Sequence, residues 1–165
     1  MIVDVFEEFA ASLPAGQPVL GLDLGTKTLG IAASDLRLST ASPVEVIRRR
    51  KFGQDAERLL ALAASRSACG LVLGLPRNMD GSEGPRCQST RAFARNLSNL
   101  TPVPITFWDE RLSTVAAERA LIEADLTRKR RSEVIDAVAA AYILQGALDR
   151  IGFLRAEDPR PDTTR

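Results

Sequence analysis

Two carboxylates stand inside segments that are otherwise apolar. Asp23 interrupts the run Val19–Leu24, and Asp136 lies in the run Val134–Leu144, where no positive charge stands three or four residues away from it. Burying an unpaired carboxylate is costly, so each acid needs compensation. Asp23 could simply open a turn at Gly25, and Asp136 could be satisfied by the dipole at the start of its helix. Both acids could instead be ligands of a cation.

A pair of acids, Asp109 and Glu110, follows the apolar segment Ile105–Trp108 and precedes Arg111. The carboxyl end of a strand is where ligands usually bind in sheets of the α/β class. Because successive strand residues face opposite sides of a sheet, at most one of the two acids shares a face with Asp23. The pattern does not decide which one does, and an ion pair with Arg111 in a solvated loop is the alternative interpretation.

The chain contains no histidine. This excludes Ser-His-Asp and Cys-His nucleophiles, histidine general bases and zinc sites that include histidine. Three carboxylates that converge without histidine would form a set of hard oxygen ligands, which suits Mg²⁺ or Mn²⁺. Such a site activates water and stabilises the leaving oxygen of a phosphodiester, with two metal ions about 4 Å apart.

Length and composition indicate one globular domain. The chain has 165 residues, of which 45% are hydrophobic and 26% charged. Its two cysteines, Cys69 and Cys87, are too few for a disulfide framework or a zinc site, and we expect Cys69 to be a small core residue. No apolar run looks long enough to span a membrane, and the acidic start does not resemble a secretory leader. We therefore expect a cytoplasmic protein without a membrane partner.

Positive charge is distributed unevenly along a nearly neutral chain. The net charge is +1, yet residues 48–58 hold five positive and two negative charges, and residues 111–131 hold six positive and three negative. The first 15 residues carry three acids and no base, so the remainder has a net charge of +4. A moderately positive face suits transient, salt-sensitive contact with nucleic acid. The basic run Arg128–Arg131 could also be a solvated connector.

Hydrophobic periodicity predicts the elements that must position the acids. We expect a mixed five-stranded sheet flanked by helices, in the α/β class. The expected strands are 19–24, 29–34, 43–50, 70–75 and 103–108, and the expected helices are 2–13, 56–64, 87–97, 113–124 and 132–148. We further expect residues 1–15 to be a leading helical extension docked on the surface, 16–154 the domain itself, and 155–165 a disordered tail.

Four stretches resemble the YqgF/RuvX family, RNase H-like proteins described as pre-16S rRNA nucleases and as Holliday-junction resolvases. The stretches are Leu20–Asp35, Leu73–Arg86, Trp108–Thr114 and Ile135–Gln145, and they occur in the family's order. The resemblance extends from about Val19 to Leu148. The leading helix and the tail lie outside it.

The resemblance implies an RNase H-like fold and an endonuclease that depends on Mg²⁺ or Mn²⁺ and uses water as its nucleophile. It assigns Asp23, Glu110 and Asp136 as catalytic residues and metal ligands, with Asp23 bridging the metals. It thereby selects Glu110 over Asp109. The residues expected to contact nucleic-acid phosphates are Lys27, Arg77, Asn78, Arg86 and Arg111.

The implied substrate is precursor rRNA, cut at the 5′ end of pre-16S rRNA during ribosome biogenesis. Branched DNA is the alternative, and a resolvase would need a symmetric homodimer rather than a monomer. A non-catalytic nucleic-acid-binding module is an alternative of another class. The segment Asp23–Lys27 also resembles the first phosphate loop of actin-like kinases, but those enzymes close two such domains over a nucleotide and this chain has room for one.

Overall fold

The computed structural model describes residues 1–112 and 128–157, with side chains in the second range from residue 135 onward. The strands are β1 (Val19–Leu24), β2 (Thr28–Ser34), β3 (Ala41–Arg48), β4 (Gly70–Leu75) and β5 (Ile105–Asp109). The helices are α1 (Phe6–Ser12), α2 (Phe52–Ser65), α3 (Pro85–Ser98), the short 3₁₀-helix η1 (Glu110–Leu112) and α5 (Arg128–Glu157).

The five strands form one mixed sheet in the order β3-β2-β1-β4-β5. β1, β2 and β3 are antiparallel neighbours, whereas β4 and β5 run parallel to β1. The carboxyl ends of β1, β3, β4 and β5 and the start of β2 therefore meet at one end of the sheet. We call this the acid end, because Asp23 and Glu110 lie there. The α/β prediction of a five-stranded mixed sheet is confirmed.

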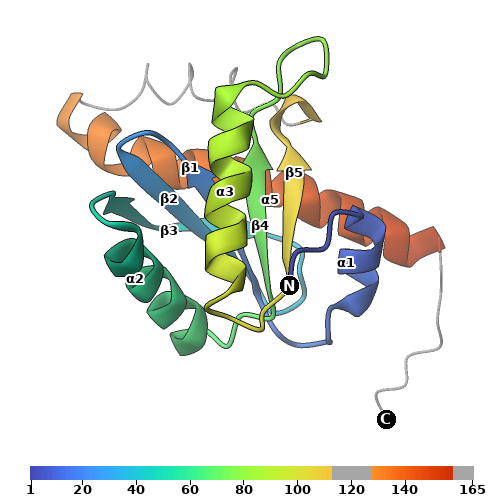
Figure 1. Ribbon diagram of the computed structural model, residues 1–165. Helices are drawn as coiled ribbons and strands as arrows, with labels where there is room; N and C mark the ends of the chain where they lie inside the picture. Colours follow the sequence, from blue (N-terminus) through green and yellow to red (C-terminus); the bar gives the residue numbers. More distant parts are fainter. Residues whose placement is uncertain (113–127, 158–165) are drawn as a thin grey trace.

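Helices cover both faces of the sheet (Figure 1). α2 and α3 lie on one face, over a core that includes Leu20 and Leu22, and α5 crosses the other face, over Val19 and Val72. The alternation of side chains along β1 explains this division, since even-numbered residues face α2 and α3 and odd-numbered residues face α5. Asp23 therefore belongs to the α5 face.

Glycines allow α5 to approach the sheet closely. A Cβ placed on Gly21 would lie 2.6 Å from Cβ of Leu144 and 3.0 Å from the carbonyl oxygen of Ala140. A Cβ on Gly30 would collide with the main chain of α5 at Asp136. The helix presents small buried alanines to the strands, so that main chain packs almost directly on main chain.

The leading residues are part of the sheet and its core. The N–H of Val3 donates to the carbonyl of Ile105 at 2.8 Å, and the N–H of Ile105 donates to the carbonyl of Met1 at 2.9 Å. Ile2 consequently makes a parallel bridge with Ile105 at the outer edge of β5. Phe9 is fully buried. The leading segment is therefore more than a helix docked on the surface, because residues 1–3 pair with the edge of β5 and α1 contributes Phe9 to the core.

Several element boundaries differ from the sequence prediction. α5 begins at Arg128, four residues before the expected start, and continues to Glu157, so residues 155–157 are helical rather than part of a disordered tail. β3 begins at Ala41, two residues early, because Ser42 and Pro43 pair with β2 around a bulge at Ile31/Ala32. The helix expected over 113–124 lies outside the described residues. The division into extension, domain and tail stays a prediction.

One described helix has the length and apolar composition of a membrane-spanning helix. It is the part of α5 from Ile135 to Glu157, 23 residues, of which half of the most apolar window is buried inside the protein. Ala140, Leu144 and Leu148 of this helix pack on the sheet with almost no exposed surface. The apolar character of α5 is therefore that of a core helix.

Substituting Gly21→Ala should destabilise the protein by about 1–3 kcal/mol, because α5 must move away from β1 to admit the methyl group. Gly53→Ala is the matched control, since a Cβ at Gly53 meets nothing within 4 Å. The control should be neutral or stabilising by up to about 1 kcal/mol, because alanine favours a helix over glycine. Urea unfolding of both variants measures this difference. Equal stability of the two variants would contradict the described packing of α5.

Candidate active site

Asp23 is a nearly buried acid on the α5 face of the central strand. Its residue is only 6% exposed, and within the sheet it pairs with Gly30 of β2. On the other side, Leu22 pairs with Leu73 of β4, which places Gly74 beside Asp23. Asp23 is thus flanked in the sheet by two glycines, and the space over them is filled by the main chain of α5 at Asp136 and by the side chains of Ile143 and Glu110.

Asp136 reaches the same place from α5. Its main chain packs against Gly30, the residue paired with Asp23. The hydroxyl of Thr28 donates a hydrogen bond of 2.7 Å to Oδ2 of Asp136. Thr28 begins the strand that returns after Asp23, so a single hairpin carries one acid and orients another.

Glu110 occupies the other flank. A Cβ placed on Gly74 would lie 2.8 Å from Oε1 of Glu110, so this carboxylate lies over the glycine next to Asp23. Asp109, the last residue of β5, lies one position earlier and makes an ion pair of 2.6 Å with Arg111. Glu110 is therefore the acid that shares the face of Asp23, which alternation alone had left open.

The donor set suits a divalent cation in kind. Asp23, Glu110 and Asp136 offer only carboxylate oxygens, the ligands that Mg²⁺ and Mn²⁺ prefer. Within the described part of the chain, however, no three Asp, Glu, Cys or His side chains are gathered closely enough to form a ready-made metal site. The fold brings the acids to one end of the sheet without drawing their oxygens into one cluster.

A basic cavity adjoins Glu110. It has a volume of about 380 Å³ and lies between the end of β4, the start of α3 and η1. Its lining residues are Pro76, Arg77, Asn78, Gly84, Pro85, Arg86, Glu110 and Arg111. Four of the five residues expected to contact phosphate line this cavity together with a candidate catalytic acid. The fifth, Lys27, is exposed in the turn between β1 and β2.

Two features of this cavity favour an anion. α3 begins at Pro85 with Gly84 as its N-cap, and no side chain caps the first turn, so main-chain N–H groups are available there. The Nε–H of Arg77 is buried and has no acceptor among the described residues. An oxyanion in the cavity could accept from both kinds of donor.

The loop that leads into α3 is held by its own hydrogen bonds. The N–H of Asn78 donates to the carbonyl of Ser82 at 2.9 Å, and the side-chain amide of Asn78 donates to the Ser82 hydroxyl at 3.0 Å. Arg111 donates to Asp109 and also to the carbonyl of Met79 at 3.4 Å. Arg111 thus braces the loop against η1, in addition to lining the cavity.

Sequence reasoning missed Thr28. The hydrogen bond that orients Asp136 joins residues 108 positions apart. The only local signal is a hydroxyl five residues after Asp23, and nothing in the pattern of the hairpin identifies its partner.

The cysteines are placed differently from expectation. Cys87 is fully buried at the start of α3, whereas Cys69, the expected core residue, is only partly buried. Burial raises the pKa of both thiols, so both stay protonated and poorly nucleophilic at neutral pH.

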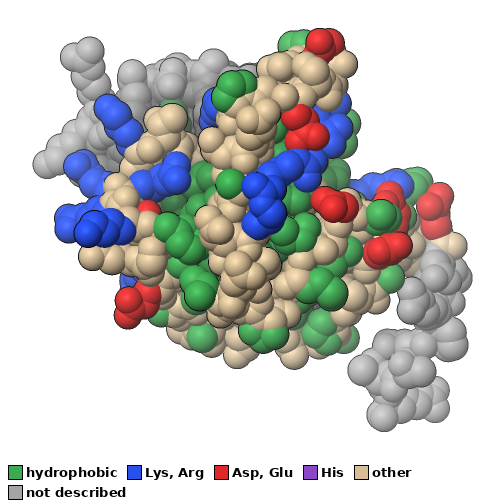
Figure 2. Space-filling view, viewed as in Figure 1, with side chains coloured by type: hydrophobic (Ala, Val, Ile, Leu, Met, Phe, Trp, Pro, Cys, Tyr) green, Lys and Arg blue, Asp and Glu red, His purple; other side chains and the backbone are tan. Residues whose placement is uncertain are grey.

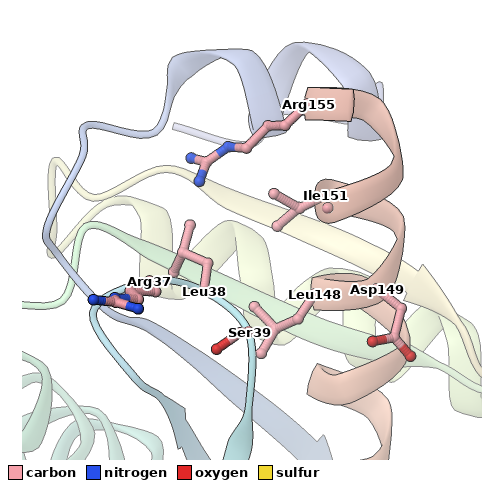
Figure 3. A pocket seen from close by; sticks show the side chains of 8 residues that line it. Arg37, Leu38, Ser39, Leu148, Asp149, Ile151 and Arg155 are labelled. Carbon is pink, nitrogen blue, oxygen red and sulfur yellow. The ribbon is translucent and has the colours of Figure 1, made fainter. Parts of the chain in front are cut away.

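A second cavity lies at the opposite end of the sheet from the acids. It has a volume of about 340 Å³ and lies between the β2–β3 loop and the last turns of α5. Leu38, Leu148 and Ile151 form an apolar floor, and Arg37 and Arg155 also line the cavity (Figure 3). Asp149, its one acidic lining residue, points away. It offers no set of acids for the chemistry of the acid end.

Comparisons with known proteins agree on one group of relatives. Residues 17–150 match the family model described as "RuvX: Holliday junction resolvase". A protein of Ruegeria pomeroyi named "Putative pre-16S rRNA nuclease" is 72% identical over 92% of this chain and 98% of its own length. A protein of Paracoccus denitrificans with the same name is 69% identical over 93% of this chain and 98% of its own length.

Solved structures agree on the fold. The structure described as RuvC of T. thermophilus in complex with Holliday junction substrate matches with a TM-score of 0.50 and 17% identity. It covers 82% of this chain and 96% of that one. A second Thermus thermophilus RuvC structure gives the same TM-score at 16% identity. At such low identity the likeness concerns the RNase H-like fold alone.

The ion pair at the end of β5 predicts a pH dependence of stability. The Arg111 guanidinium holds the pKa of the Asp109 carboxyl below its ordinary value. A lowered folded-state pKa stabilises the protein above the unfolded pKa of about 3.9, and this contribution is lost as the pH falls through the folded value. The free energy of unfolding should therefore exceed that of Asp109→Asn by up to about 1 kcal/mol at pH 6 and by less at pH 3. Urea unfolding at both pH values measures the difference, and a constant difference would contradict it.

Proposed function

Because the chain belongs to the YqgF/RuvX family, we propose that it is an endonuclease that depends on a divalent metal and processes the 5′ end of pre-16S rRNA. The observation that carries this proposal is the meeting of Asp23, Glu110 and Asp136 at one end of the sheet. The two relatives at 72% and 69% identity, both named for pre-16S rRNA, favour this substrate.

Asp23, Glu110 and Asp136 would hold Mg²⁺ or Mn²⁺ through their carboxylate oxygens. The bound cations would supply positive charge that activates water and stabilises the leaving oxygen. Thr28 keeps Asp136 directed into the site through its hydroxyl. The glycines at 30 and 74 let the main chain of Asp136 and the side chain of Glu110 approach the sheet beside Asp23. No histidine is required, because water activation rests on the acids and the cation.

The cavity beside Glu110 would hold the substrate's phosphates. Arg77 and Arg86 supply guanidinium groups, and the first turn of α3 supplies main-chain N–H groups. The substrate backbone would then be fixed next to the acids before cleavage, so that water meets a phosphodiester in a defined position. Arg111 contributes by keeping the loop in place.

Cleavage of branched DNA is the second candidate function, and the description of the family model favours it. A junction resolvase must cut two strands symmetrically, which requires a homodimer with two active sites. Side-by-side assays on a pre-16S rRNA fragment and on a four-way DNA junction, together with the mass of the protein in solution, separate the two functions. A monomer that cuts only RNA supports rRNA processing.

We assign the nuclease domain to residues 16–154 and place the protein in the cytoplasm, where precursor rRNA is available in a bacterial cell.

Two alternative functions of other classes remain to be tested. In a non-catalytic nucleic-acid-binding module, the three acids would have a structural role alone. An actin-like phosphotransferase would bind ATP tightly, and calorimetry with ATP tests that alternative.

Asp23→Asn, Glu110→Gln and Asp136→Asn should each lower the rate of RNA cleavage by about 100-fold or more, since each removes charge that the metal needs. Glu57→Gln is the matched control, because Glu57 is an exposed acid of α2 away from the site. The control should cleave at the parent rate. The measurement is single-turnover cleavage of labelled pre-16S rRNA with Mn²⁺. Parent-like cleavage by any of the three acid variants would overturn its assignment.

Mn²⁺ should raise the melting temperature of the parent protein and leave that of Asp23→Asn unchanged. Thr28→Val should need about 10–100-fold more Mn²⁺ for the same rise, because Asp136 loses the hydroxyl that orients it. Differential scanning fluorimetry over a Mn²⁺ titration measures both effects. An equal response of parent and Asp23→Asn would show that the cation binds elsewhere.

A further inference from the structure

We propose that a second nucleic-acid contact surface lies across the acids from the arginine cavity. It consists of the exposed cations Lys27, Arg48, Arg50 and Lys51, which we call the β3-edge patch. Its ligand is the phosphate backbone of a structured RNA whose cleaved bond lies at the acids, so this inference rests on the nuclease function proposed above. The substrate then contacts the protein on both sides of the bond that is cut.

The fold ties the patch to the acid end. Arg48 ends β3 and pairs in the sheet with Thr28, the residue that orients Asp136. The N–H of Arg49 donates to the carbonyl of Lys27 at 2.8 Å, and its guanidinium donates to the carbonyl of Gly25 at 2.5 Å. The segment after β3 is therefore fastened to the turn that follows Asp23.

The charge of the patch is uncompensated within the described structure. None of its four side chains makes an ion pair with a described residue, and the nearby acid Asp55 is buried and accepts the main-chain N–H of Arg50. Figure 2 shows Lys and Arg side chains gathered on the flank where β3 ends and α2 begins. Other surface arginines do pair with carboxylates, namely Arg58, Arg91, Arg111 and Arg150.

Four like charges without acids among them repel one another. Binding of a polyanion removes this repulsion, and it also releases the counterions condensed on the polyanion, which favours binding. The patch and the arginine cavity stand on opposite sides of Asp23, on β3 and at the end of β4. Three strand spacings, about 14 Å, separate those strands. A nucleic-acid strand advances about 3.4 Å per nucleotide, so about four nucleotides bridge the two surfaces. This span places the acids between two sets of phosphate contacts.

The test measures binding rather than cleavage, with Asp23→Asn protein and no divalent metal. The patch variant carries Arg48→Gln, Arg50→Gln and Lys51→Gln, and Arg49 is retained because it fastens the turn. The matched control carries Arg37→Gln, Arg66→Gln and Arg155→Gln, which remove the same charge from exposed residues at the opposite end of the sheet. Melting temperatures verify that both variants fold.

Fluorescence anisotropy with a labelled pre-16S rRNA stem, and in parallel with a four-way DNA junction, gives the affinity at several salt concentrations. The patch variant should bind the RNA about 10-fold or more weakly at low salt, and its slope of log affinity against log salt should fall by about 2–3. The control should change the affinity by less than about 3-fold and keep the slope. If the patch variant loses affinity for the four-way DNA junction but not for the RNA stem, the patch binds branched DNA and the proposal of an RNA ligand is overturned.

An unchanged slope in the patch variant would overturn the inference, and self-association with unchanged affinity would show that the charges only protect the sheet edge. Cleavage by the parent protein with Mn²⁺ is measured in the same series. If the parent protein cleaves RNA and the patch variant keeps the parent's salt slope, the β3-edge patch is overturned as a contact surface and the nuclease function stands. Binding that depends on the patch without any cleavage overturns the nuclease function and leaves the contact surface in place.

Discussion

The close approach of α5 to the sheet is the constraint on which the candidate site depends. Gly30 admits the main chain of the helix at Asp136, and Gly21 admits it one to two turns later, at Ala140 and Leu144. A helix held at an ordinary distance by larger side chains would carry Asp136 away from β2. The hydrogen bond from Thr28 would then be out of reach. The glycines that let α5 pack closely on the sheet are thus also the residues that bring Asp136 within reach of Thr28.

The partition of charge follows from the topology. The strand ends that carry the acids also carry Arg48, Arg77 and Arg111, because four strands finish and one starts at that end. The opposite end has the apolar cavity floored by Leu38. A chain with a net charge of only +1 can therefore present concentrated charge of both signs on one side. The net charge of the whole chain does not reveal that charges of both signs are concentrated at one end of the sheet.

Alternation and breaker residues were enough to predict the five strands and to single out Asp23, because a charge in a buried strand contradicts its surroundings. They could not reveal that Gly30 and Gly74 flank it, since strand pairing between distant segments is a property of the folded chain. The start of α5 was set four residues late because Ser132 resembles an N-cap. Cys69 is only partly buried although it stands in an apolar run, whereas Cys87 is buried because α3 turns its polar neighbours outward.

The pairing of the leading residues with β5 has a consequence for the order in which the protein assembles. A separation of 103 residues lies between Val3 and Thr106, whose hydroxyl donates to the Val3 carbonyl at 2.7 Å. Closing so long a loop costs more chain entropy than joining β1 to β2 across a short turn. The hairpin can form early from local contacts, whereas the β5 edge is completed only when both ends of the domain meet. The pairing at the β5 edge, the edge farthest from the hairpin that carries Asp23, is therefore expected to form last.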